Sequence, residues 1–112
     1  MEKNLPFTDL TAGGKNYMLR LTALSAVRLE ERLGCSIYEG VKRLSEVTVV
    51  TEFLFALIAG LRPEITRNEV YSIFDEFISE GGSLRKLNEI IAQALGASGF
   101  FDIGGGGSPP QK

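Results

Sequence analysis

The segment from Thr48 to Arg62, TVVTEFLFALIAGLR, carries almost no polar side chains. Glu52 is its only charged residue before Arg62. A helix that is apolar on all sides is either buried in a core or crosses a membrane, and a crossing needs roughly 20 apolar residues. Because Arg62 and Pro63 end the run, it is too short to cross. The sequence therefore predicts a helix over 49–60 that the other elements surround.

The whole chain has the size and charge of one small soluble domain. It has 112 residues, a net charge of −2 and no stripe of basic residues. A chain of this length buries enough surface to fold without metal or disulfides. Binding to nucleic acid or to an anionic membrane usually needs a basic patch, so we expect neither. The N-terminus shows no signal peptide, and a single cysteine favours a reducing compartment.

The residue types on which most enzymes depend are missing. The chain has no histidine and one cysteine, which excludes Ser-His and Cys-His nucleophile pairs and the usual structural zinc site. Catalysis by carboxylates alone remains open. The acidic pairs Glu30-Glu31 and Asp75-Glu76 are adjacent in sequence, so their members do not face each other on a helix. We expect solvated surfaces there, and no enzyme activity, cofactor or metal.

The first part of the chain predicts a β-hairpin. Two short strands, Leu5–Leu10 and Asn16–Leu21, flank a loop that contains Gly13-Gly14. Along the second strand, Tyr17, Leu19 and Leu21 alternate with Met18, Arg20 and Thr22, which is typical of a strand with one buried face. A lone hairpin is marginal in water, so this one must pack on helices.

Helical periodicity predicts five helices after the hairpin, and their start signals are clear. They are expected over 23–33, 36–45, 49–60, 67–80 and 84–95. In the first of them we expect Val27 beside the buried stripe, and Arg28, Glu30, Glu31 and Arg32 in water. The expected N-caps are Thr22, Ser36, Thr48, Thr66 and Ser83, because a side-chain oxygen at this position accepts from the first turn of a helix. Ser36 with Glu39 and Thr66 with Glu69 have the form of capping boxes, and Ile65 with Val70 that of a hydrophobic staple. The fold class is mainly α, with an N-terminal β-hairpin followed by a compact bundle of about five short helices.

Two features have simple structural interpretations. Cys35 lies between the first two helices, where we expect a small apolar filler, since no cation or base that would activate a thiol is evident in the sequence. Short helices with tight corners raise the option of a helix-turn-helix DNA reader. The predicted helices lack the basic and amide residues of a recognition helix, so we do not favour it.

The end of the chain changes character after Gly99. Residues 1–103 are expected to form a single domain, and 104–112, GGGGSPPQK, have the composition of a flexible tail. Phe100, Phe101 and Ile103 lie just before this tail. They either fold back onto the bundle or form an exposed apolar segment for a partner. We take these three residues as the predicted partner-binding site.

Three stretches of the chain resemble the tail assembly chaperones of long-tailed phages and related gene transfer agents. Residues 17–22, YMLRLT, resemble the family's opening strand, which enters a helix through "LRLT". Residues 26–37, AVRLEERLGCSI, resemble its "LEE-LG-S" helix-corner-helix. Residues 57–62 and 65–70, LIAGLR and ITRNEV, resemble its "L-AGL" helix and "LT-EEV" restart. Asn68 stands where the family usually has an acid, a departure that touches only the helix cap.

The resemblance implies a small, mostly helical protein in the host cytoplasm. Such chaperones coat the tape measure protein, recruit tail tube subunits and leave the finished tail. Self-association is a further option for this chain. Many are made in a short form and a frameshifted long form. The glycine run would suit a slippery G tract, since all glycine codons start with GG, and this chain would then be the short form.

The residues alone, without the resemblance, predict a helical interaction domain that lacks catalytic groups. The alternative to a tail assembly chaperone is therefore a non-enzymatic protein-interaction or adaptor domain of a bacterial host.

Overall fold

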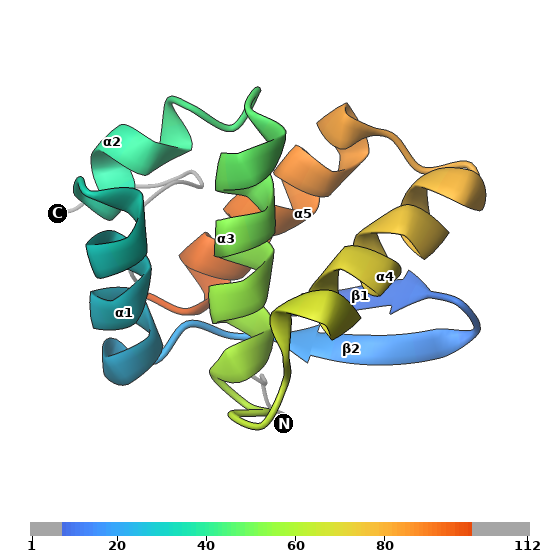
Figure 1. The fold of residues 1–112 in the computed structure, drawn as a ribbon, viewed down its shortest axis with the longest axis horizontal. Coiled ribbons are helices and arrows are strands. Elements are labelled where there is room, and N and C mark those ends of the chain that lie inside the picture. The colour runs from blue at the N-terminus through green and yellow to red at the C-terminus, as the bar shows by residue number, and fades with distance from the viewer. Residues whose placement is uncertain (1–7, 100–112) are drawn as a thin grey trace, which may run out of the picture.

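The computed structural model describes residues 8–99, and the chain forms a hairpin followed by five helices (Figure 1). The elements are β1 Thr8–Ala12, β2 Lys15–Leu19, α1 Ala23–Leu33, α2 Ile37–Val41, α3 Val47–Ala59, α4 Arg67–Ser79 and α5 Leu84–Ala97. The predicted fold class is confirmed. The expected tail at 104–112 lies outside the described residues, and in the described part no helix is long and apolar enough to cross a membrane.

The hairpin is tighter than the sequence predicted. β1 and β2 pair antiparallel from Thr8↔Leu19 to Ala12↔Lys15, and only Gly13 and Gly14 form the turn. Both glycines have positive φ, at 60° and 76°, which a two-residue turn of this hand requires. The expected limits were therefore wrong: β1 runs on to Ala12, and β2 begins at Lys15.

The inner face of the hairpin packs on α3, α4 and α5, as expected for a hairpin that is marginal alone. This face carries Leu10, Ala12, Tyr17 and Leu19, all of which are buried.

α3 is the centre of the molecule, as predicted. It contacts α1, α4, α5 and β2, and in Figure 1 it lies between α1 and α4 with α5 behind it. Phe53, Leu54 and Leu57 are fully buried. The predicted start was wrong, because α3 begins at Val47, and its N-cap Glu46 makes no side-chain capping bond.

The path from β2 to α1 crosses the C-terminal end of α3. The backbone N–H of Arg20 donates to the carbonyl oxygen of Leu57 at 2.9 Å, so β2 ends at Leu19 rather than at Leu21. This bond satisfies one of the carbonyls that the last turn of a helix leaves without a partner. A Cβ atom on Gly60 would lie 1.8 Å from the carbonyl oxygen of Arg20. Only glycine therefore permits this crossing.

The corner between α1 and α2 is held by three local devices. α1 has the predicted bounds, and Gly34 ends it with φ 73°. Ser36 caps α2 by accepting from the N–H of Glu39. Glu30, which we expected in water, accepts from the N–H of Ile37 at 2.8 Å. The Glu39 side chain does not return the second bond of the predicted capping box, because its carboxylate pairs with Lys42 at 3.4 Å.

The start of α4 confirms the predicted capping box and staple. Thr66 and Glu69 exchange both capping bonds, and Ile65 and Val70 are buried beneath them. The corresponding box at the start of α1 was missed, because there Ser25 takes the place of the usual Glu or Gln.

The first two turns of α5 agree with the prediction, but its end does not. Ser83 caps α5 as expected, and the helix continues past Gly96 to Ala97. The Ser98 hydroxyl then accepts from the Leu21 N–H at 2.8 Å and donates to the Ala94 carbonyl. This hydroxyl therefore ties the last turn of α5 to the segment that enters α1.

Two smaller limits also differ from the prediction. α2 is only one turn long and passes into hydrogen-bonded turns up to Glu46, whereas we expected a helix to about Ser45. Val27, placed beside the buried stripe of α1 in the prediction, is 55% exposed.

Candidate functional site

One side of α3 stays accessible, although the sequence predicted a helix buried all round. Glu52, Phe55 and Ala59 lie at i, i+3 and i+7 and are only partly buried. Figure 1 shows α1 and α4 on the two sides of α3, and a side chain from each of these two helices reaches Glu52. The stripe is therefore the floor of a surface formed by α1, α3 and α4.

Two arginines converge on this floor from opposite sides. Arg32 of α1 donates through Nε to Glu52 Oε1 at 2.7 Å, and Arg67 of α4 donates through Nη1 to Glu52 Oε2. Their guanidinium carbons lie 4.9 Å and 5.2 Å from the centre of the Phe55 ring. One carboxylate and one ring thus hold two cations in place, through charge-assisted hydrogen bonds and cation–π contacts.

The surroundings of Arg67 in this cluster favour its charged form. The hydrogen bond and the charge of Glu52 raise the pKa of Arg67 above its usual value, with a further contribution from Tyr71. The side chains of Arg32 and Glu52 are 24% and 19% exposed, so water screens this pair only in part. We expected Arg32 in water, and that prediction was wrong because Glu52 draws it onto α3.

A groove of about 390 Å³ begins beside this cluster, between α1 and the C-terminal half of α3. Its lining, which we name the α1–α3 groove, comprises Thr22, Leu24, Ser25, Arg28, Arg32, Phe55, Ala59, Gly60 and Pro63. Leu24 is 60% exposed, and Arg28 is also exposed. The groove therefore offers apolar side chains at its base and cationic groups along one wall.

The same surface continues along α4 beyond Arg67. Tyr71 is 45% exposed and Ile78 is 38% exposed, and both lie on the side of α4 that carries Arg67. We call the α1–α3 groove together with Glu52, Arg67, Tyr71 and Ile78 the arginine-aromatic face. Arginine and aromatic residues are enriched at protein interfaces and among their energetic hot spots.

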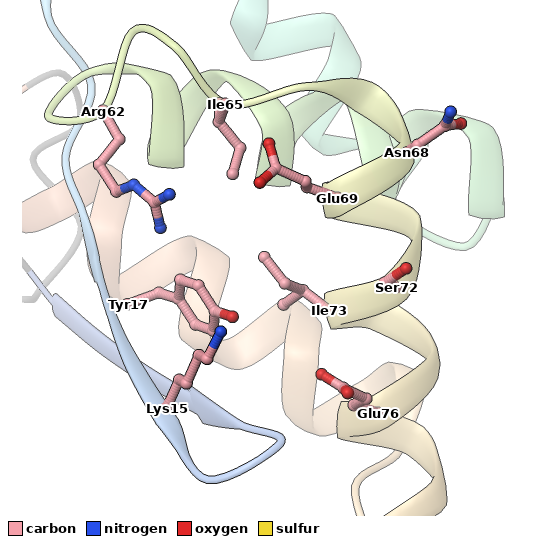
Figure 2. A pocket seen from close by; sticks show the side chains of 9 residues that line it. All are labelled: Lys15, Tyr17, Arg62, Ile65, Asn68, Glu69, Ser72, Ile73 and Glu76. Carbon is pink, nitrogen blue, oxygen red and sulfur yellow. The ribbon is translucent and has the colours of Figure 1, made fainter.

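A second pocket, of about 340 Å³, lies between β2 and α4 (Figure 2). Arg62 and Glu69 point into it near the start of α4, and Lys15, Tyr17 and Glu76 border its other end. Figure 2 also shows Asn68 pointing outward, so the residue that departs from the family pattern makes no contact across the pocket.

Glu69, one of the two acids of this second pocket, has a structural role. The capping bonds from Thr66 lower the pKa of Glu69, and the charges of Arg62 and Lys15 lower it further. A carboxylate held in its charged form by a helix N-terminus is a poor general acid or base near neutral pH. Lys15 and Arg62 are balanced by Glu69 and Glu76, so the pocket has no excess charge to attract an anion.

The predicted partner-binding residues, Phe100, Phe101 and Ile103, lie outside the described residues. The arginine-aromatic face is therefore a candidate that the sequence did not reveal. A signal was present in the order of residues, because Arg28 and Arg32, at i and i+4, share one side of a helix with Leu24. What the sequence could not show is that Arg67, far along the chain, joins them.

Cys35 differs from the prediction in its surroundings. Arg43 lies 3.9 Å from its sulfur, although no cation was evident from the sequence. Arg43 also binds Glu46 through Nε and Nη2, at 3.1 and 3.0 Å. The guanidinium is thus engaged mainly by a carboxylate, and the cysteine stays a partly buried, unpaired thiol.

Within residues 8–99, no group of three or more histidine, cysteine, aspartate or glutamate side chains is placed to hold a metal ion. Comparison of the chain with known protein families, with curated proteins and with solved structures found no match.

Proposed function

We propose that the protein is a tail assembly chaperone of a long-tailed phage or gene transfer agent. In this role it binds the tape measure protein and helps to recruit tail tube subunits in the host cytoplasm. It does so without catalysis and without a cofactor. The proposal rests on the resemblance of three stretches to that family, and on where the fold brings those stretches.

The observation that carries the proposal is that the resembling stretches meet at structural joints. In "LRLT", Arg20 donates its N–H to Leu57, and in "L-AGL", Gly60 leaves room for the Arg20 carbonyl. In "LEE-LG-S", Glu30 accepts from Ile37, which fixes the corner after α1. The connections between elements tolerate fewer residue types than the exposed faces of helices do. The same order of these connecting stretches in this chain and in the family therefore supports a common fold.

A binding role is also supported by the arginine-aromatic face. The tape measure protein expected from the resemblance is long and helical, and a helix commonly docks its apolar side into a groove. The α1–α3 groove supplies Leu24, Phe55 and Ala59 for such a contact, with cations beside them.

Co-purification tests the proposal. The full chain is co-expressed with the tape measure protein encoded near its gene, and one partner is captured by a tag. We expect a soluble complex, and a tape measure protein that aggregates when it is expressed alone. A tape measure protein that never associates with the chain, and gains no solubility from it, would refute the proposal and favour the adaptor domain of a bacterial host.

A further inference from the structure

The charge of the arginine-aromatic face is opposite to that of the chain. Its α1–α3 groove is lined by Arg28 and Arg32 and by no carboxylate, and Glu52 and Arg67 lie beside it, whereas the whole chain has a net charge of −2. Such a local excess of positive charge steers an acidic partner to this face and lowers affinity for basic ones.

Glu52 does not use up the hydrogen-bonding capacity of its two arginines. Its carboxylate accepts one hydrogen bond from Nε of Arg32 and one from Nη1 of Arg67. Each guanidinium has five N–H donors, whereas one carboxylate offers about four acceptor sites, so the pair has donors in excess. Glu52 and Phe55 therefore hold the arginines in fixed positions without exhausting them, and this lowers the entropic cost of binding a second carboxylate.

Arg28 adds a cation that is not bound within the described part of the chain. It is exposed on α1, one turn before Arg32, and no carboxylate among residues 8–99 pairs with it. Leu24 lies one turn before Arg28 and is 60% exposed. An apolar residue and two cations therefore follow each other along the groove at helical spacing.

We propose that the α1–α3 groove binds an acidic amphipathic helix of the partner. A large apolar side chain of that helix packs between Leu24 and Ala59, and a glutamate or aspartate one turn away pairs with Arg28 and Arg32. This inference rests on the proposed function in one respect, because it takes the helix to be a segment of the tape measure protein. Its chemistry, an acid one turn from an apolar residue, comes from the groove itself.

Binding of peptides to the full chain tests the inference. The probes are overlapping synthetic peptides that cover the tape measure protein, and a designed 20-residue helix with leucines on one side and glutamates beside them. Fluorescence anisotropy reports binding to the parent chain, to Arg28→Glu and to the matched control Arg85→Glu, an exposed position at the start of α5.

We expect the tape measure peptides that bind to be acidic and amphipathic. Arg28→Glu should weaken both these peptides and the designed helix by at least about tenfold, a loss of about 1.4 kcal/mol of binding free energy. Arg85→Glu should leave both unchanged, and circular dichroism should show the same helical fold for both variants. A peptide with arginine in place of its glutamates should regain affinity for Arg28→Glu.

The outcomes separate the two proposals. If tape measure peptides bind equally to Arg28→Glu and Arg85→Glu, the groove assignment is wrong and the proposed function stands. If the designed helix binds and depends on Arg28, while no tape measure peptide binds and the tape measure protein does not co-purify with the chain, the groove assignment stands and the proposed function fails. If neither binds, or if Arg28→Glu acts only by dissociating a complex of two copies of the chain, the acidic partner helix is refuted.

Discussion

Phe53 and Phe55 lie two residues apart on α3 and have opposite surroundings. The Phe53 side chain has no exposed surface, whereas Phe55 lies partly open between two guanidinium groups. Both belong to a segment that looks uniformly apolar in the sequence. The comparison shows that such a helix can have one side for the core and another for the surface, when arginines from neighbouring helices cover part of the second side.

The largest effect should come from the buried side of α3. Leu57 is fully buried, and Leu57→Ala should lower the free energy of unfolding by about 2–5 kcal/mol, the usual cost of a buried cavity. Urea unfolding followed by circular dichroism measures it. Leu24→Ala, at a residue that is 60% exposed, should change stability by less than about 0.5 kcal/mol. If Leu57→Ala and Leu24→Ala lowered the free energy of unfolding equally, α3 would not be the centre of the core.

The next largest effect should come from the joint at the end of α3. Gly60→Ala places a methyl group on the Arg20 carbonyl, and we expect a loss of about 1–3 kcal/mol from overpacking. Amide hydrogen exchange should show a specific loss of protection at Arg20. In Gly34→Ala, where the added Cβ meets no atom within 4 Å, Arg20 should stay protected relative to global unfolding. If the Arg20 amide stayed equally protected in Gly60→Ala, the segment from β2 to α1 would be able to pass the end of α3 without the close approach at Gly60.

A smaller effect is expected at the start of α4. Thr66→Ala removes the side-chain acceptor of the capping box and should cost about 1 kcal/mol in thermal or urea unfolding. Thr48→Ala is the matched control, because Thr48 was predicted as an N-cap but lies inside α3. A loss at Thr48 as large as that at Thr66 would contradict the cap assignment.

The smallest effect is a pH dependence. The pKa of Glu69 is lowered in the folded chain by its bonds with Thr66. Ionised Glu69 therefore stabilises the fold above its unfolded pKa of about 4.3, and this contribution is lost as the pH falls through the folded pKa. Glutamine can replace glutamate in a capping box. Glu69→Gln lacks this contribution, so it should be slightly less stable than the parent near pH 7 and lose less stability on acidification, and the two profiles should converge at low pH. Profiles that stay parallel over the whole pH range would show that Glu69 is not a source of the pH dependence.

Local signals in the sequence were sufficient for much of the fold. Thr22, Gly34, Thr66 and Ser83 mark helix ends by chemistry that involves only near neighbours, and each was placed correctly. The prediction of Thr48 as an N-cap was wrong, because α3 already begins at Val47 and its N-cap, Glu46, makes no side-chain capping bond. Similarly, a turn at Gly13-Gly14 was expected, but the sequence did not show how far strand pairing extends beside it, because this depends on the helices beneath.

The candidate site was not predictable because it depends on distant parts of the chain. Arg32, Glu52 and Arg67 come from three helices, and only packing brings them onto Phe55. Each alone is an ordinary charged residue on a helix surface. The sequence did contain the predicted segment of Phe100, Phe101 and Ile103, which lies outside the described residues and stays a prediction.

That prediction has its own test. Truncation after Gly99 should leave the circular dichroism spectrum unchanged and weaken association with the tape measure protein or between copies of the chain. If truncation melts the helices, the three residues belong to the core. If neither fold nor association changes, partner binding rests on the arginine-aromatic face alone.

The division of α3 into a core side and a binding side is tested most directly by a pair of substitutions. Phe53→Ala should lower the free energy of unfolding by about 3–5 kcal/mol, the usual range for a buried phenylalanine. Phe55→Ala should cost no more than about 2 kcal/mol, mainly from its two cation–π contacts. Phe55→Ala should also weaken binding of the tape measure protein by at least about tenfold. Equal destabilisation by the two substitutions, or full binding by Phe55→Ala, would contradict this division.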